Sequence, residues 1–204
     1  MNFDCWPNLS FERDCAKARS PSTLRWATNM ETLHFLLLLV LVSTATASEG
    51  VWYDGNKIVP DRPHQKAEAG FGAQLQLTKK ESFFTNWASP QTPQLEIART
   101  AEVGDRVYSV LFFFGAGKDK KGGSHVTFTG RVLDPEGKPI QEFEDVRAIQ
   151  GHNSAGEYDL RLSDGHMMAL FSAASKKGTY TFELIITDHI KKVNLLLSEK
   201  IDLK

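Results

Sequence analysis

The stretch GTYTFELIITDHIKKVNLLLSEKIDL, residues 178–203, decides the fold class. Apolar residues largely alternate with polar ones over 180–186, and the alternation returns over 193–203. A period of two places one set of side chains on one face of a strand and leaves the other face in water. The stretch therefore predicts two β-strands separated by a turn near Asp188.

The same alternation recurs upstream, and turn motifs separate the segments. The alternating runs are 71–77, 126–132 and 158–162, and the turns are DPEG at 134–137, SDG at 163–165 and KKG at 176–178. This spacing is typical of an antiparallel β-sandwich. A parallel α/β sheet would need long amphipathic helices between its strands, and the sequence shows none. We therefore expect an all-β fold with antiparallel strands.

One short helix is expected after the first alternating run. Thr78 and Glu81 have the T-x-x-E spacing of a capping box, in which each side chain bonds a free backbone N–H of the other residue. The residues that follow place Phe83, Phe84 and Trp87 on one side of the helix. A helix of two to three turns is marginal in water, so this aromatic side must pack on the sheet.

The strand predicted at 107–114 is apolar on both faces, unlike the others. One face carries Val107, Leu111 and Phe113, and the other carries Tyr108, Val110, Phe112 and Phe114. Something must cover the second face, or it stays exposed as an adhesive patch. Two alternatives follow: the aromatic helix or the N-terminal hairpin covers it, or it is a surface for a protein partner or for self-association.

Four regions are expected along the chain. Residues 1–29 are an upstream extension or a long basic n-region, 30–47 a signal peptide, 48–70 an N-terminal hairpin and linker, and 71–204 the β-sandwich domain. The hairpin prediction rests on the Asp-Gly dipeptide within VWYDGNKIV, because a type I′ turn needs positive φ at both central residues. The two prolines and the lack of periodicity in PDRPHQKAEAG indicate a linker.

The signal peptide rests on the apolar run FLLLLVLV at 35–42, which is shorter than the roughly 20 residues of a membrane-spanning helix. Ala45-Thr46-Ala47 follows directly, as a cleavage site would. A start at Met30 is favoured over Met1. Cleavage before Ser48 predicts an exported protein, periplasmic or secreted, with no membrane anchor in its mature form.

Composition narrows the classes of function. Both cysteines, Cys5 and Cys15, precede Ser48, so the mature chain would have no disulfide and no thiol nucleophile. The whole chain has 24 basic and 25 acidic residues. This balance argues against a nucleic-acid partner, which would favour a basic stripe.

The segment FFFGAGKDKKGGS, residues 112–124, is glycine-rich like a phosphate-binding loop but lacks the residues that such a loop needs. The motif needs G-x-x-x-x-G-K-[ST], with the lysine on the phosphates and the hydroxyl on magnesium. Here Phe112 replaces the first glycine and Asp119 replaces the hydroxyl residue. We expect no nucleotide cofactor, and interpret the segment as a flexible, solvated hairpin loop.

Histidines offer one metal hypothesis. His152 and His166 flank the run at 158–162 and, with Met167 or Met168, would resemble a soft copper site. The alternative is that both histidines are ordinary turn residues and that the methionines fill the core. His125 and His189 are interpreted as rim residues beside strands, and His64 as part of the linker.

No catalytic constellation is singled out. The chain lacks the G-x-S-x-G pentapeptide of serine hydrolases. Several acids could pair as acid and base without any pair being favoured: Asp159, Asp164, Asp188, Glu142 and Glu144. The acids of QEFEDVR are interpreted as the solvated face of an edge strand that resists edge-to-edge pairing. Trp52 could serve as a sugar-stacking platform, or simply pack on its neighbour.

The segment KKGTYTFELIITDHIKKVNLLLSEKIDL resembles the final hairpin of immunoglobulin-like domains in exported bacterial proteins. The resemblance implies an immunoglobulin-like sandwich, and such domains serve adhesion, chaperone, accessory and sugar-binding roles. We expect an exported non-catalytic binding or accessory module. The alternative is a small secreted metal carrier or hydrolytic enzyme that uses His152 and His166.

Overall fold

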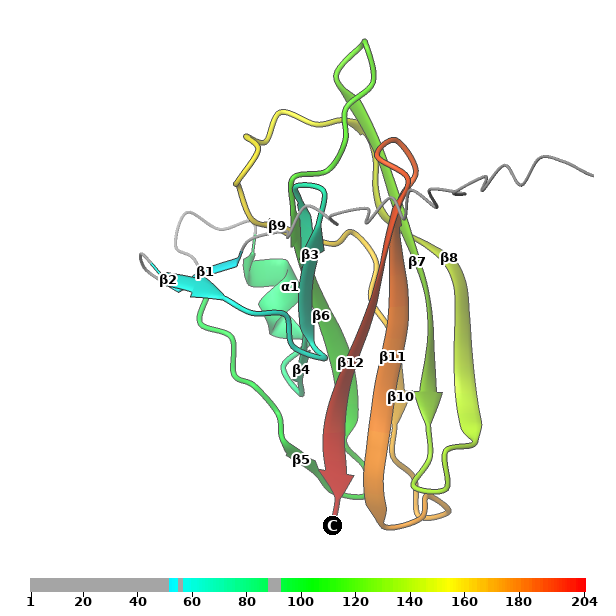
Figure 1. The fold of residues 1–204 in the computed structure, drawn as a ribbon. Coiled ribbons are helices and arrows are strands. Elements are labelled where there is room, and N and C mark those ends of the chain that lie inside the picture. Colours follow the sequence, from blue (N-terminus) through cyan, green and yellow to red (C-terminus); the bar gives the residue numbers. More distant parts are fainter. Residues whose placement is uncertain (1–51, 55–56, 88–92) are drawn as a thin grey trace, which may run out of the picture. The chain divides into compact units, whose positions relative to one another are not determined.

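The computed structural model describes residues 52–54, 57–87 and 93–204, which form two facing β-sheets and a small hairpin (Figure 1). The larger sheet has the strand order β5-β12-β11-β7-β8. Its strands are β5 (Thr100–Ala101), β12 (Val193–Leu203), β11 (Gly178–Asp188), β7 (Gly123–Leu133) and β8 (Pro139–His152). All of its pairings are antiparallel except the short parallel pairing of β12 with β5.

The smaller sheet has the order β10-β6-β4-β3, and β9 also pairs with β6. Its strands are β10 (Met168–Leu170), β6 (Arg106–Phe114), β4 (Phe71–Thr78), β3 (Gln65–Glu68) and β9 (Arg161–Leu162). The linker prediction for 60–70 was therefore wrong in part, because β3 pairs with β4 and forms an edge of this sheet. β3 has the sequence QKAE, with alanine as its one apolar residue, so it shows no alternation that would indicate a strand.

The N-terminal hairpin is present but is shifted by one residue from the prediction. It consists of β1 (Trp52–Asp54) and β2 (Lys57–Val59), and Asp54 pairs with Lys57. The connection is therefore 55–56, which lies outside the described residues. Asp54 ends a strand and is not a central residue of the turn.

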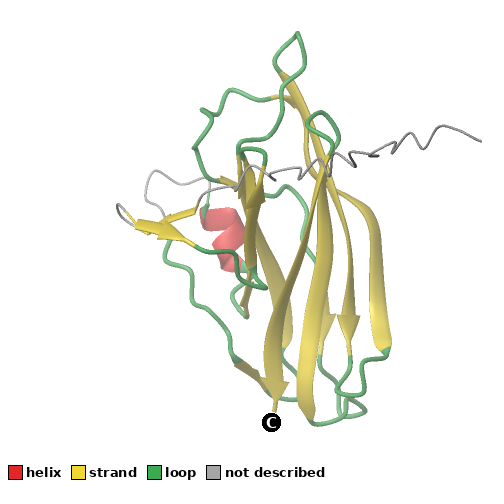
Figure 2. Ribbon diagram, in the orientation of Figure 1, coloured by secondary structure: helices red, strands yellow, loops and turns green. Residues whose placement is uncertain are grey.

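For the described residues, the prediction of an all-β fold with one short helix is confirmed (Figure 2). The alternating residues of β11 and β12 face the smaller sheet and form the main core with the inner residues of β4 and β6. Phe113, Phe128, Phe182 and Leu75 are completely buried there. Side chains of this size supply most of the hydrophobic free energy that holds two sheets together.

The helix α1 (Ser82–Asn86) is shorter than predicted and has no capping box. Glu81 is its N-cap and makes no side-chain capping bond. Thr78 still belongs to β4, and its hydroxyl accepts a hydrogen bond from the Lys80 N–H at 3.2 Å. The Glu81 carboxylate accepts one from the Tyr108 hydroxyl at 3.1 Å. A local turn therefore takes the Thr78 hydroxyl and a tertiary contact takes the Glu81 carboxylate, so neither group is left for the capping box.

The aromatic side of α1 packs on the outer face of β6, as the sequence predicts. Phe83 lies edge-on to Phe112 with ring centroids 6.1 Å apart, and Trp87 lies 5.3 Å from the same ring. Trp52 of the hairpin covers Phe114 at 5.0 Å. The four residues proposed as an exposed patch are thus buried: Tyr108, Val110, Phe112 and Phe114. Of the two alternatives for this face, the structure shows the covered one.

The loop between β6 and β7 is not a hairpin turn, and the prediction of a solvated loop holds only for its tip, because residues 118–121 are exposed whereas Gly115 and Gly117 are buried. β6 belongs to the smaller sheet and β7 to the larger, so the loop crosses between the sheets. The buried Asp188 carboxylate accepts hydrogen bonds from the N–H groups of Gly117 at 2.6 Å, Ile190 at 2.9 Å and Lys191 at 2.9 Å. One carboxylate therefore joins the loop after β6 to the turn after β11.

The strand predicted at 158–162 is mostly loop. Only Arg161 and Leu162 are paired, as β9, and Tyr158 is 75% exposed. The Gly156 N–H donates to the Asp159 carboxylate at 2.7 Å, which turns the chain before a strand can start. Short alternating runs between turn residues are ambiguous for this reason.

The predicted signal peptide at 30–47, the upstream segment 1–29 and both cysteines lie outside the described residues. Within the residues that the structure does describe, no helix has the length and apolar character needed to cross a membrane.

Replacement of Phe83 by alanine tests the contact between α1 and β6. Phe83 is 4% exposed, so its loss should lower the free energy of unfolding by about 3 to 5 kcal/mol, the usual cost of emptying a buried aromatic site. Tyr158→Ala is the matched control and should change stability by about 0.5 kcal/mol or less, because Tyr158 is on the surface. Urea denaturation measures both, and equal effects would contradict the packing.

Replacement of Asp188 by alanine tests the joint between the two loops. Three buried or half-buried N–H groups would lose their acceptor, so the free energy of unfolding should fall by roughly 3 kcal/mol or more. The control Asp164→Ala removes an exposed ion pair with Arg147 and should cost less than about 1 kcal/mol. A small effect at Asp188 would show that the loops do not depend on it.

Candidate functional site

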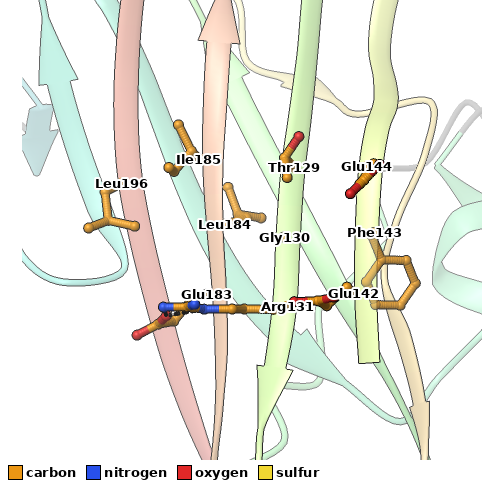
Figure 3. Close-up of a pocket in the computed structure, with 10 residues that line it drawn as sticks. All are labelled: Thr129, Gly130, Arg131, Glu142, Phe143, Glu144, Glu183, Leu184, Ile185 and Leu196. Atoms are coloured by element: carbon orange, nitrogen blue, oxygen red, sulfur yellow. Dashed lines mark hydrogen bonds and ion pairs between the residues drawn. The ribbon is translucent and has the colours of Figure 1, made fainter. Parts of the chain in front are cut away.

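A hollow of about 310 Å³ opens on the outer face of the larger sheet, away from the core (Figure 3). β7, β8, β11 and β12 all contribute to it. The residues that line it are Thr129, Gly130, Arg131, Glu142, Phe143, Glu144, Glu183, Leu184, Ile185 and Leu196.

A β-bulge in β8 shapes the hollow. Phe128 pairs with Val146 and Gly130 pairs with Phe143, so two residues of β8 stand opposite Thr129 alone. Asp145, one of these two, has a positive φ of 47°, and its N–H points to the Thr129 hydroxyl at 3.4 Å. A bulge bends its strand and increases the local twist. The bend turns this part of β8 out of the regular plane of the sheet, beside Thr129.

Gly130 allows the floor of the hollow to lie close to the core. A Cβ atom at this position would lie 2.5 Å from Met167 Sδ and 2.9 Å from the Glu183 carbonyl oxygen. Met167 is completely buried, as expected for a methionine that fills the core. Any larger residue would push Met167 away or lift β7 from its neighbours.

The hollow has an excess of negative charge. The Arg131 guanidinium donates to Glu183 Oε2, with Nε at 3.0 Å and Nη2 at 2.9 Å. Glu142 stands opposite Arg131 on β8, and Glu144 is the other residue of the bulge beside Asp145 (Figure 3). Among the described residues, neither Glu142 nor Glu144 has a basic partner within 4.0 Å. Three carboxylates and one guanidinium leave a formal charge of minus two.

Two aliphatic side chains stand beside these charges. Ile185 and Leu196 are cross-strand neighbours on β11 and β12 and are 46% and 53% exposed. Cross-strand aliphatic pairs on a solvent face offer apolar contact area at a fixed position. The ten lining residues include no histidine, cysteine, serine or lysine, so the ionisable groups of the hollow are three glutamate carboxylates and the Arg131 guanidinium.

The sequence interpretation placed Glu142 and Glu144 on the solvated face of an edge strand. β8 is an edge strand of the larger sheet, as that interpretation requires. The hollow itself was not predicted, because a bulge depends on the register between two strands and not on the pattern of either one. The break in alternation at Asp145 within QEFEDVR was the one available indication.

The structure places His152 and His166 in different surroundings. His166 stacks on Phe84 with ring centroids 4.3 Å apart and meets the edge of Tyr108 at 5.7 Å. His152 ends β8 opposite Gly123, in the other sheet. No group of three or more His, Cys, Asp or Glu side chains arranged to hold a metal occurs among the described residues. The proposed copper pair is therefore not brought together here.

The remaining histidines and Trp52 also have defined contacts. His125 and His189, interpreted as separate rim residues, stack on each other with centroids 4.1 Å apart. His64 Nδ1 lies 3.5 Å from Oε2 of the buried Glu199, which Arg99 binds at 2.6 Å. Trp52 donates its Nε1–H to the Lys66 carbonyl at 3.0 Å and packs on Phe114, so it is not a free stacking platform.

Comparison with known proteins adds little to this site. No protein-family model and no curated protein matches the sequence. Solved structures that match include a family 123 glycoside hydrolase from Clostridium perfringens, studied for glycolipid glycan hydrolysis, at a TM-score of 0.35 and 11% identity. The match covers 66% of this chain and 27% of the hydrolase. A similarity this low supports no inference about fold or activity.

The buried surroundings of His166 predict a pH effect on stability. Burial lowers the pKa of His166, and the nearby Glu81 carboxylate opposes this only in part. The unfolded chain, with an ordinary histidine pKa near 6.5, therefore takes up a proton first, and stability is lost as the pH falls below that value. His166→Phe should reduce the difference between urea midpoints at pH 7.5 and 5.0. An unchanged difference would contradict the prediction.

Proposed function

We propose that this chain is an exported, non-catalytic binding module that holds a basic, partly apolar segment of a partner protein in the outer-face hollow. The observation that carries the proposal is the pairing of two uncompensated glutamates, Glu142 and Glu144, with the exposed aliphatic pair Ile185 and Leu196. The export component rests on the apolar run and the small-residue tripeptide within 30–47.

Electrostatics favours a cationic ligand. Arg131 is already bound to Glu183, so the free acceptors of the hollow are carboxylate oxygens. A lysine or arginine side chain would supply the missing donors and place its aliphatic stem along Ile185 and Leu196. A basic segment therefore satisfies both the charge and the apolar part of the hollow, whereas an acidic one satisfies neither.

The setting of the hollow also supports binding. It lies on four hydrogen-bonded strands, so its residues are held by the sheet and not by mobile loops. Rigid placement lowers the entropy that association must overcome. The alternative that uses His152 and His166 as a metal or catalytic pair has no comparable support, because these residues lie in different surroundings.

Binding of a labelled lysine-valine peptide, compared with a glutamate-valine peptide of equal length, tests the proposal by fluorescence anisotropy. The lysine peptide should bind more tightly, and more weakly as salt rises. The double variant Glu142→Gln and Glu144→Gln should weaken it about fivefold, the effect of losing two partly exposed ion pairs. Leu196→Asn should also weaken binding of the lysine peptide, because it removes part of the apolar surface of the hollow.

The matched control is the double variant Glu102→Gln and Glu157→Gln. Both residues are exposed and outside the hollow, and the change in net charge is the same. This control should bind the lysine peptide like the wild type. If both double variants weaken binding equally, the effect comes from net charge alone and the hollow is not the site.

A further inference from the structure

His125 and His189 come together on the outer face of the larger sheet, toward the ends of β7 and β11. Val126 pairs with Asp188 in the antiparallel ladder, and the next residues outward are these two histidines. The His189 N–H donates to the His125 carbonyl oxygen at 3.0 Å, which holds the two backbones in register. The sheet therefore sets the positions of both side chains.

The two imidazole rings lie face to face. Their centroids are 4.1 Å apart and their planes differ by 21°. His125 is half-buried and His189 is exposed, so solvent and ions can reach the pair. A neutral imidazole has one nitrogen that donates and one with a free lone pair, so the pair presents two lone pairs close together.

Thr127 orients one of the rings. Its hydroxyl oxygen lies 2.9 Å from His189 Nε2. When Nε2–H donates to this oxygen, His189 Nδ1 keeps its lone pair free. Histidines that bind metals are usually held in this way, with the second ring nitrogen donating to an oxygen. The contact from Thr127 is thus of the kind that orients metal-binding histidines.

The spacing fits a shared metal ion. Two imidazole nitrogens that each lie about 2.0 to 2.1 Å from one ion can be at most about 4.2 Å apart. The ring centroids lie 4.1 Å apart in the stacked arrangement, so the rings are close enough to share an ion once rotation about their side-chain bonds turns a lone pair of each toward it.

We propose that His125 and His189 form a surface site for a divalent transition metal, with Cu²⁺ bound more tightly than Zn²⁺. Imidazole nitrogens suit both ions, and Cu²⁺ is the tighter binder of such donors in the divalent series. The protein supplies two ligands and water completes the coordination. The site is separate from the outer-face hollow and does not depend on the function proposed for it.

Metal binding would join β7 directly to the turn after β11. The same turn is held from the inside by Asp188, next to His189 in sequence. A metal that binds only the folded sheet stabilises it by mass action. The site would therefore raise the melting temperature of the protein when metal is present and leave it unchanged when metal is absent.

Calorimetric titration of the full chain with Cu²⁺ and with Zn²⁺ tests the proposal. All variants carry Cys5→Ser and Cys15→Ser, so that the two thiols do not bind the metal. We expect one ion per chain and tighter binding of Cu²⁺. His125→Ala and His189→Ala should each weaken binding about a hundredfold, because the second nitrogen binds at high effective concentration. Thr127→Val should weaken it about tenfold, and Thr127→Ser should restore it.

His152→Ala is the matched control, because His152 is another exposed histidine at the end of a strand of the same sheet. It should leave affinity and stoichiometry unchanged. The electron paramagnetic resonance spectrum of the Cu²⁺ complex should show two nitrogen ligands, and one in either single variant. The proposal is overturned if His152→Ala loses as much Cu²⁺ affinity as His125→Ala or His189→Ala. It is also overturned if neither His125→Ala nor His189→Ala changes the binding curve.

Discussion

The arrangement of layers follows from one constraint, which is that β6 is apolar on both faces and cannot be left against water on either. Its inner face joins the main core through residues such as Leu111 and Phe113. Its outer face needs a separate cover, and α1 and the N-terminal hairpin supply it with Phe83, Trp87 and Trp52. Burying both faces of one strand therefore produces three layers from a short chain.

The opposite side of the molecule is under no such constraint. The outward positions of β7 and β11 pair as Thr127 with Thr187, Thr129 with Ile185 and Arg131 with Glu183. These side chains are half-buried or exposed, and nothing in the described part of the chain packs over them as α1 packs over β6. A sheet with one covered face and one open face has its free chemical groups on the open one. Both the hollow and the histidine pair lie there.

Local periodicity was enough to predict β4, β7, β11 and β12 and the role of the aromatic helix face. The alternation in 178–203 became β11 and β12, and Phe83 packs on the second face of β6. Features that depend on the contact of distant residues were not predictable. Glu81 bonds Tyr108 and not the backbone, Asp188 reaches Gly117, and the bulge at Asp145 exists only relative to β7. The candidate site consists of such features. The sequence therefore indicated that Glu142 and Glu144 face solvent, but it did not indicate the hollow that they line.

The closure of the smaller sheet against β12 has a consequence for folding kinetics. The Ser198 N–H donates to the Pro63 carbonyl at 2.8 Å, and Arg99 reaches Glu199, 100 residues later. These contacts join the beginning of the sandwich to its last strand. Loops of this length close slowly, and proteins dominated by such pairings fold in milliseconds to seconds. The two sheets therefore cannot close on each other until β12 has been synthesised and is free to pair, and before that β3 and β4 lack their final partner.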